Sequence, residues 1–531
     1  MRTVRQVAIC VLLSAFSLLL VACTVSVPAL DGESALQAGS ARLARVYEEQ
    51  QMLAAPLDLP DAIARALLYN LDYRAAFMSE AMAREDLSRS SFALWPQLAA
   101  GAGYSARDTY ASSVSKDPVT GFQTLQPSTA SDKKTTTAQL QLTWNALDFG
   151  VGYLRAQQKG NMLLIAEEQR RKAFQSIVQD VTFVWWRALA AQRMEPRLQA
   201  LRERVESALS RSRQMEEMRL QAQLPLLDYR RDLLLSLKRL AALQEEVLNA
   251  RNDMVRLVAL PDGASLALVE PADQAEPGWL PNLTREELQR IALANRPELR
   301  ELNYRQRIAG LEGKVAVASL LPSLNLAAGP RYDSNSFLVH NDWNEANAQL
   351  SFNLLNLAAL PMARRYGKAA AAAESLHADA MTVAVISQLG IALRAIETDR
   401  RNWCLSRELG RVAAQREEQY RARAASSAGD ELTQIRSEVE AVLAALESAF
   451  SFAELEASHA LLLNTLGVDP YPADLTQEGP TEVAEQLRSY FAAGLNVRLQ
   501  EEASALGGNG APEAPVAAVP ALRSFEELCV L

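Results

Sequence analysis

The 531-residue sequence predicts an α+β membrane protein that is mostly α-helical and internally duplicated. Three observations lead to this fold class. Two parts of the chain align with each other, and each contains short segments in which apolar and polar residues alternate. In each part, the alternating segments are followed by long segments in which apolar residues recur every three or four positions. Alternation is typical of strands with one apolar face, and spacing of three and four is typical of coiled-coil helices.

Composition and charge exclude some classes of protein. The chain is 49% hydrophobic and 22% charged, so it can bury a large apolar surface without being a bundle of membrane helices. The formal net charge of −9 provides no general electrostatic attraction for nucleic acid. We therefore expect no nucleic-acid partner.

The chain begins with a predicted signal peptide, residues 1–22. Two arginines precede an apolar run that is too short to favour a membrane-spanning helix over a secretion signal. The run ends in Leu20–Cys23, which resembles the bacterial lipobox, so we expect a covalent lipid (palmitate) on Cys23. By analogy with such lipoproteins, Thr24 implies sorting to the outer membrane. The alternative is an ordinary signal peptide with an incidental cysteine. Residues 23–56 would form a polar, partly helical N-terminal segment (the N-terminal lead) that connects the lipid anchor to the first repeat.

An internal repeat organises the rest of the chain. The aligned pairs of segments are 61–74 with 287–300, 95–98 with 321–324, and 142–149 with 350–357. The first two pairs are 226 positions apart (322 − 96) and the third pair is 208 apart (350 − 142). The first copy therefore has 18 extra residues (226 − 208), within the Ser/Thr/Asp-rich segment 107–137, where we expect an exposed loop. The alignment predicts repeat 1 at 57–282 and repeat 2 at 283–470.

Each repeat is predicted to start with a helix and to continue with a β-hairpin, at about 97–148 and about 323–356. The apolar strand positions are Leu98, Ala100, Ala102, Tyr104, Leu140, Leu142 and Trp144, then Leu324, Leu326, Ala328, Leu350, Phe352 and Leu354. Polar or small residues alternate with them, as in a barrel that meets lipid outside and water inside. The alternative is an edge hairpin packed on a soluble core. In lipid, four strands cannot close a barrel without open edges, so several chains would share one.

Long helices follow each hairpin, at about 151–218 and 226–259 and then at about 360–424 and 432–466. We expect the first to bend near Pro196. The returning helices carry seams spaced by four and three: Tyr229, Leu233, Ser236, Leu240, Leu243, Val247, Ala250, Met254 and Leu257, then Ile435, Val439, Val442, Leu446, Ala449, Ala453, Glu456, Ala460 and Leu463. This spacing predicts two antiparallel coiled-coil hairpins.

The C-terminal region follows the repeats. Residues 471–503 are predicted to form an equatorial segment, and residues 504–531, rich in Pro, Gly and Ala, a disordered tail. If Cys23 is acylated and the signal peptide removed, Cys404 and Cys529 remain. Neither belongs to a CxxC pair, and the sequence does not say whether the two meet. For Cys404 a buried or idle thiol is the preferred interpretation.

No pattern of residues points to catalysis, so we expect no enzyme and no metal site. The three histidines, none of them in HExxH or CxxC-like spacing, are His340, His377 and His459. No phosphate-binding glycine motif follows a predicted strand, so energy would have to come from a partner. The arginines Arg202, Arg204, Arg211 and Arg213 are interpreted as a solvated helix face.

Several motifs together resemble the TolC family of outer-membrane efflux proteins, in its lipoprotein subclass. The family's Asn-Pro-Glu-Leu, Leu-Pro-Ser-Leu and aromatic-x-Gly patterns correspond to Asn295–Leu299 and Asn70–Tyr73, to Leu321–Leu324 and Trp95–Leu98, and to Asp148–Gly150. The resemblance covers about residues 57–467. The second copy reads Asn356–Ala358 and lacks the glycine, which puts the local turn in doubt rather than the fold.

The resemblance implies a homotrimer with a twelve-stranded β-barrel, four strands from each chain, above a periplasmic α-barrel. Such channels of Gram-negative bacteria work with a periplasmic adaptor (membrane fusion protein) and an inner-membrane pump, and passively conduct drugs, metals or polypeptides outward. It implies no cofactor besides the lipid on Cys23, which would insert among outer-membrane lipids. The alternative is a lipid-tethered periplasmic coiled-coil scaffold or adaptor with no conducting pore.

The resemblance also implies a pore constriction at the periplasmic helix tips, where trimer symmetry would turn each acidic side chain into a ring of three. The acidic residues in the matching region are Asp228, Asp232, Asp430 and Glu431. Alternatively, Asp430 or Glu431 caps the helix that begins near Leu432. The candidate adaptor contacts at the same tips are Leu224, Pro225, Ser427 and Gly429.

Overall fold

The computed structural model describes residues 29–48, 56–116, 118–123, 126–145, 148–217, 223–261, 264–269, 283–425, 431–469, 479–492 and 495–507. The predictions for the signal peptide, Cys23, Ser427, Gly429, Asp430 and the tail beyond Gly507 lie outside these residues. The chain divides into two compact units. One contains helix α2 (Gly32–Glu48), within the predicted N-terminal lead, and the other contains all the elements described below.

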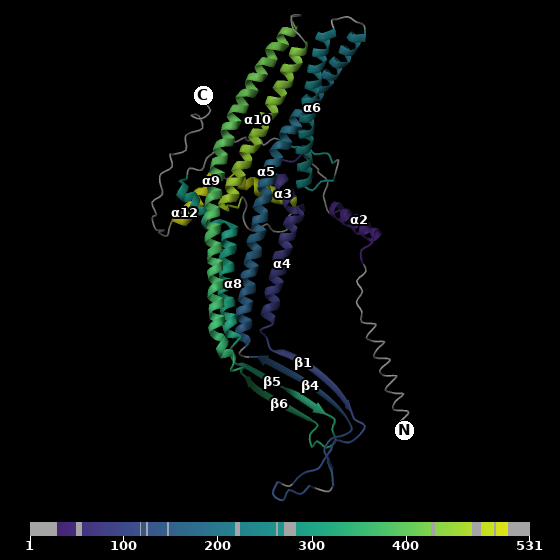
Figure 1. The fold of residues 1–531 in the computed structure, drawn as a ribbon, viewed down its shortest axis with the longest axis vertical. Helices are drawn as coiled ribbons and strands as arrows, with labels where there is room; N and C mark the ends of the chain where they lie inside the picture. The colour runs from purple at the N-terminus through teal and green to yellow at the C-terminus, as the bar shows by residue number, and fades with distance from the viewer. Residues whose placement is uncertain are drawn as a thin grey trace. The chain divides into compact units, whose positions relative to one another are not determined.

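The larger unit repeats one order of elements twice (Figure 1). The first set is α3 (Leu59–Tyr69), α4 (Leu71–Phe92), β1 (Gln97–Ala106), β4 (Lys134–Asn145), α5 (Asp148–Glu217) and α6 (Gln223–Leu257). The second is α7 (Arg285–Asn295), α8 (Pro297–Ala318), β5 (Ser323–Asp333), β6 (Asp342–Ser351), α9 (Asn356–Ala425) and α10 (Glu431–Leu466). The starts of α3, α4 and β1 precede those of α7, α8 and β5 by 226 positions (323 − 97), the offset of the sequence alignment.

The start of α4 explains the Asn-Pro-Glu-Leu-like motif and its variation between repeats. Asn70 ends α3, and its Oδ1 accepts hydrogen bonds from the backbone N–H groups of Asp72 and Tyr73, at 2.9 and 3.1 Å. In the second repeat, Pro297 occupies the first position of α8, where its missing N–H costs nothing. A side-chain cap and a proline therefore restart the helix at the same place.

Strands β1, β4, β5 and β6 form one antiparallel sheet in that order (Figure 1). The register places Leu142 opposite Leu98 on one side and opposite Ala328 on the other. Predicted apolar residues therefore share one face of the sheet, and polar residues the other. Phe352 and Leu354, predicted as strand positions, instead follow the end of β6. The predicted exposed loop of the first hairpin contains a further short pair, β2 (Ser112–Ser113) with β3 (Ser128–Thr129).

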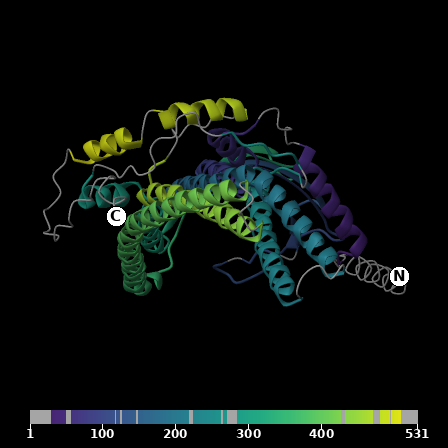
Figure 2. The same cartoon turned by 90° about the horizontal axis from the view of Figure 1, so that it is seen from above.

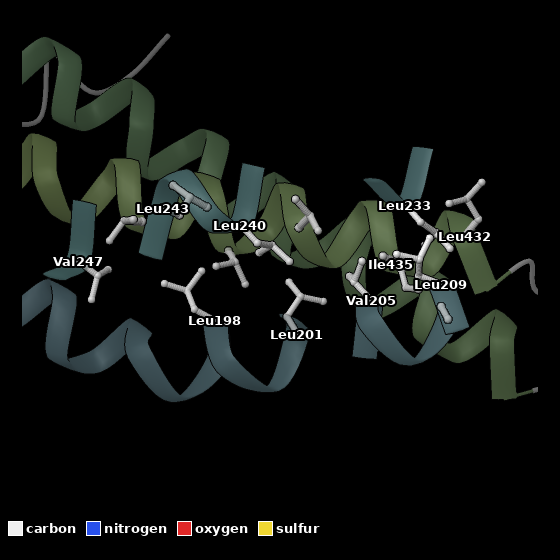
Figure 3. Packing of buried hydrophobic residues seen from close by; sticks show 14 of the residues in the cluster. Leu198, Leu201, Val205, Leu209, Leu233, Leu240, Leu243, Val247, Leu432 and Ile435 are labelled. Carbon is white, nitrogen blue, oxygen red and sulfur yellow. The ribbon is translucent and has the colours of Figure 1, made fainter. Parts of the chain in front are cut away.

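The long helices bury a continuous apolar seam. Leu198, Leu201 and Val205 of α5 pack with residues of α6 and α10 (Figure 3). The first predicted seam is buried from Leu233 to Met254. The second is buried from Ile435 to Ala453 except for half-buried Ala449; beyond it the predicted positions Glu456, Ala460 and Leu463 are only half-buried. There the buried residues are Leu455, Ser458, His459, Leu462, Thr465 and Leu466. A stripe with a repeat of seven drifts around a helix of 3.6 residues per turn, so the second prediction is wrong at its end.

An equatorial cluster surrounds the middle of the long helices. It comprises buried residues of α7, α8, α9 and α10 together with Leu499 of α12 (Leu495–Gly507). Half-buried Cys404 of α9 packs against it and is disulfide-bonded, so the expectation of a buried or idle thiol is wrong. Helix α11 (Pro480–Ala492) packs against α3, and α12 packs against α7. From above, the long helices form a curved layer with α11 and α12 (yellow) on its convex side (Figure 2). Because α12 continues to Gly507, the predicted start of the tail at residue 504 is wrong.

Candidate functional site: a two-faced sheet and a charged helix tip

The polar face of the sheet is suited to line water. Its residues include Gln139, Gln141, Thr143, Asn325, Arg331, Glu345, Asn347 and Gln349. Arg331 Nε lies 3.1 Å from a carboxylate oxygen of Glu345, so these two charges compensate each other. Gly101 and Gly103 lie on the same face opposite Gln139 and Thr137 and keep it shallow.

The apolar face is exposed. Leu98 and Leu350 are 65% and 67% exposed, so no other element within the described residues covers them. Trp144 stands at the end of the sheet next to the helices, and Tyr104 and Tyr332 stand near the other end. Strands of 10–12 residues are long enough to cross a bilayer when tilted, and aromatic residues gather at both interfaces of such barrels. This face is therefore suited to lipid.

A groove of about 610 Å³ lies between α5, α6 and α10 at the end of the long helices away from the sheet (Figure 1). Ion pairs cross this tip groove from helix to helix. Arg211 of α5 pairs with Glu431 of α10, and Arg436 of α10 pairs with Asp232 of α6. Arg231 Nε lies 3.1 Å from the same Asp232 carboxylate. The carboxylates that line the groove are therefore neutralised by arginines.

The predicted tip residues that the structure describes come together around this groove. Asp232 is the most buried acid, with a side chain 14% exposed, and Glu431 is 43% exposed. Asp228 is 57% exposed and pairs at 3.3 Å with Arg231, three residues along its own helix. The exposed residues Leu224 and Pro225 also line the groove; both lie in the first turn of α6.

The arginines of the tip are functional candidates that the sequence interpretation missed. Arg211 pairs with Glu431, and Arg204 Nη1 lies 2.5 Å from Glu438, so these two arginines are not merely a solvated face. The spacing is seven residues in both helices, and they run antiparallel. Matching seven-residue spacings of arginine and glutamate could have indicated the pairing of α5 with α10.

A buried charge cluster joins the two repeats at the equator. Arg171 of α5 donates to the carbonyl oxygens of Asn295 and Gly467, at 2.9 and 2.6 Å, and pairs with Asp469. Burial raises the pKa of the neighbouring Glu168 carboxyl, against the opposing effect of Arg300 and Arg171. One arginine therefore holds the end of α10 against the junction of α7 and α8.

The equator also contains a buried histidine. His459 Nδ1 lies 3.7 Å from a carboxylate oxygen of Glu456. Burial raises the pKa of nearby Asp399, while a hydrogen bond with Ser458 and the charge of His459 oppose the shift. Among the residues that the structure describes, no group of three or more His, Cys, Asp or Glu could hold a metal ion.

Comparison with protein-family models gives no match, and comparison with curated proteins gives none either. Solved structures do match. The Campylobacter jejuni CmeC outer-membrane channel aligns with a TM-score of 0.61 and 13% identity, over 81% of this chain and 89% of that one. The outer-membrane channel OprN aligns with a TM-score of 0.59 and 18% identity, over 77% and 90%. The open state of the Neisseria gonorrhoeae MtrE channel aligns with 0.57 and 17%, over 77% and 88%.

The chain has the fold of the TolC-like outer-membrane channels. The resemblance inferred from the sequence motifs is therefore confirmed at the level of fold, as is the mostly helical class with a few strands. Within this TolC-like fold, the sheet and the tip groove occupy opposite ends of the long helices (Figure 1).

Proposed function

We propose that the chain is the outer-membrane channel of a tripartite efflux or secretion system, and that it passively conducts substrates to the exterior. One observation carries this proposal: a sheet with an uncovered apolar face and a polar face continues directly into helices of 70 residues. Such helices extend about 105 Å at about 1.5 Å per residue. A lipid-facing sheet and a long helical wall fit a duct across a membrane and the compartment beneath it.

The open edges of the sheet support assembly of several copies. Among the strands that the structure describes, β1 pairs only with β4, and β6 only with β5. In lipid, unpaired backbone groups at such edges cost several kcal/mol each, so β6 of one copy would pair with β1 of the next. Three copies would supply twelve strands, the homotrimer that the family resemblance implies.

The helices support the same arrangement. Helix α5 packs against α4 on one side and α8 on the other. Its counterpart α9 packs against α8, but among the described elements no helix lies beside it as α4 lies beside α5. Exposed apolar side chains on the part of α9 before residue 400 include Leu357, Met362, Tyr366, Leu376, Val383 and Ile391, and those on α4 include Leu71, Phe77, Met78, Met82 and Phe92. Helix α9 is also the one described helix that is apolar and long enough to cross a membrane, and only 17% of its apolar stretch is buried. The α4 helix of the next copy would cover it.

In the assembled channel the tips would form the constriction. Asp228, Asp232 and Glu431, with Asp430 beside them, would repeat around the axis, and their arginine partners would hold neighbouring helices together. A periplasmic adaptor would contact Leu224, Pro225, Ser427 and Gly429 and open the tips, while an inner-membrane pump supplies the energy. The lipid on Cys23 would anchor the chain in the outer membrane.

The test is single-channel conductance of the purified, lipidated protein in planar bilayers, with the oligomer mass measured in the same detergent. We expect discrete, cation-favouring openings from an SDS-resistant trimer. Cys23→Ser, which lacks the lipid, should conduct equally once inserted, because the anchor lies outside the pore. A monodisperse monomer that never inserts would overturn the channel and favour the periplasmic scaffold.

A further inference from the structure

One ion pair on the polar face of the sheet lies beside an open edge. Arg331 of β5 and Glu345 of β6 are 3.1 Å apart, from Nε to a carboxylate oxygen, near the end of the sheet away from the helices. Within the described part of the chain, Glu345 has no second charged partner. Because β6 is an edge strand among the strands described, the side of Glu345 away from β5 faces that open edge (Figure 1).

An arginine occupies the matching place at the opposite edge of the sheet. Arg107 follows β1, and its backbone N–H donates to the carbonyl oxygen of Lys133 at 2.8 Å, so the ladder of β1 with β4 continues to this residue. Alternation places Arg107 on the polar face with Gly101, Gly103 and Ser105. Its side chain is exposed, and no carboxylate of the described residues pairs with it.

The internal repeat predicts the register in which the two edges would meet. Within one chain, Thr137 of β4 lies opposite Asp333 of β5. The counterpart of Thr137 is Glu345 (137 + 208), and the counterpart of Asp333 is Arg107 (333 − 226). Asp333 also repeats the backbone contact of Arg107, because its N–H donates to the carbonyl oxygen of Asn341 at 2.8 Å. A second copy that continues this arrangement therefore places its Arg107 directly opposite Glu345.

We propose that each junction between copies holds a three-residue ion cluster, in which Glu345 of one copy lies between its own Arg331 and Arg107 of the next copy. The proposal rests on the assembly of the channel proposed above. Side chains directly opposite each other in antiparallel strands have Cβ atoms about 4.5–5.5 Å apart, within reach of a glutamate and an arginine. A register shifted by two residues would place Ser105 or Thr109 opposite Glu345, and neither is charged. The charges therefore favour the register that the repeat predicts.

The cluster distinguishes the correct junction from a slipped one. Backbone hydrogen bonds between antiparallel strands form equally well in registers that differ by two residues, whereas opposite charges face each other in only one of these registers. No single copy completes the cluster, since the carboxylate comes from one copy and the second guanidinium from the next. Symmetry repeats the cluster at every junction, so a small gain at each one adds up over the ring.

Charge exchange tests the pairing in the full-length protein in detergent, by the temperature at which the oligomer dissociates on SDS gels. Glu345→Arg and Arg107→Glu should each lower that temperature by several degrees, because each brings like charges together at every junction. The double variant should dissociate at a higher temperature than either single variant, since it restores opposite charges in reversed order. Glu345→Arg with Ala106→Glu is the matched control and should show no recovery, because residue 106 lies on the other face.

Neutral variants provide a second readout if a reversed charge prevents assembly. Glu345→Gln loses both arginine partners, so Arg107→Gln added to it should lower the dissociation temperature no further. Losses that add in a stable oligomer, or a charge-exchange double variant no more stable than either single variant, would overturn the cluster and leave the channel standing. An original chain that forms no oligomer would overturn the channel and the cluster together.

Discussion

Gly329 lies where the two hairpins meet, and its lack of a side chain permits that contact. A Cβ at this position would lie 1.9 Å from the backbone oxygen of Leu140 on β4. The next residue, Pro330, has no N–H to give to the ladder. The backbones of β4 and β5 therefore approach closely at the point where the repeats join.

Gly329→Ala is expected to destabilise the sheet by about 1–3 kcal/mol, because a backbone atom rather than a side chain must move. The thermal midpoint of the oligomer, followed by circular dichroism in detergent, measures the loss. Gly103→Ala is the control: its Cβ would approach the Thr137 hydroxyl at 2.8 Å, and that side chain can rotate away. Equal losses in both variants would contradict the explanation.

The capping box at the start of α7 predicts a pH dependence. Thr284 donates from its backbone N–H and its hydroxyl to Glu287, at 2.7 and 2.8 Å, and these bonds hold the pKa of that carboxyl below its ordinary value. A lowered pKa means that the stabilisation is complete above the ordinary pKa of about 4.3 and is lost as the pH falls through the lowered pKa.

Hydrogen exchange of residues 283–295 measures this effect. At pH 7, Glu287→Gln should exchange about three- to five-fold faster than the original chain, as expected for the loss of about 1 kcal/mol of capping. Near pH 3 the two should converge after correction for intrinsic rates. Glu286→Gln, in the same helical turn, should show little difference at either pH. A difference that persists unchanged at pH 3 would contradict the assignment.

At the scale of elements, the sequence patterns predicted the local periods well and the contacts between elements less well. Alternation in β1 and β4 and the seam from Leu233 to Met254 depend only on residues near in sequence. The drift after Ala453 and the pairing of Arg204 with Glu438 depend on how far one helix has turned relative to another. At the tip groove the sequence analysis named the acids but not their arginine partners, because each ion pair that crosses the groove joins two different helices.

Helices α8 and α9 touch through two glycines. A Cβ on Gly367 would lie 2.7 Å from the Cα of Gly313. Gly367→Ala should therefore push the helices apart and lower the thermal midpoint, at a cost of about 1–3 kcal/mol. Gly310→Ala, on α8 with nothing within 4 Å of its Cβ, should raise the midpoint slightly by restricting the unfolded chain. If both variants shift it in the same direction, close helix contact is not the cause.

The ion pairs at the helix tip predict that two acidic residues of α6 affect the open probability of the channel differently. Asp232 links α6 to Arg436 of α10, whereas within the described part of the tip Asp228 pairs with Arg231 of its own helix and with no other residue. Asp232→Asn should raise the open probability of the channel about ten-fold, if about 0.5 kcal/mol is lost at each of three tips that open together. Asp228→Asn removes an equal charge and should leave open probability nearly unchanged. Equal single-channel effects would argue against a link between helices.

At the scale of the whole molecule, the way in which the two repeats pair within one chain predicts how two copies of the chain pair with each other. Strands β4 and β5 join repeat 1 to repeat 2, and β6 and β1 are their counterparts at offsets of 208 (342 − 134) and 226 (323 − 97). If the next copy continues the same arrangement, its β1 pairs with β6 in the register of β5 with β4. Different surfaces then meet at every junction, and the ring closes after a fixed number of copies.

That register can be tested with pairs of cysteines. Gln139 lies opposite Arg331, so Asn347 should lie opposite Ser105 of the next copy. Directly opposed residues in antiparallel strands are within disulfide reach. With Cys404 and Cys529 replaced by serine, Asn347→Cys with Ser105→Cys should yield dimers and trimers on oxidation and nothing larger, whereas either cysteine alone yields neither. The shifted pair Asn347→Cys with Tyr104→Cys places the thiols on opposite faces and should not cross-link. Cross-linking of the shifted pair instead would show that copies meet in a different register from that of the repeats.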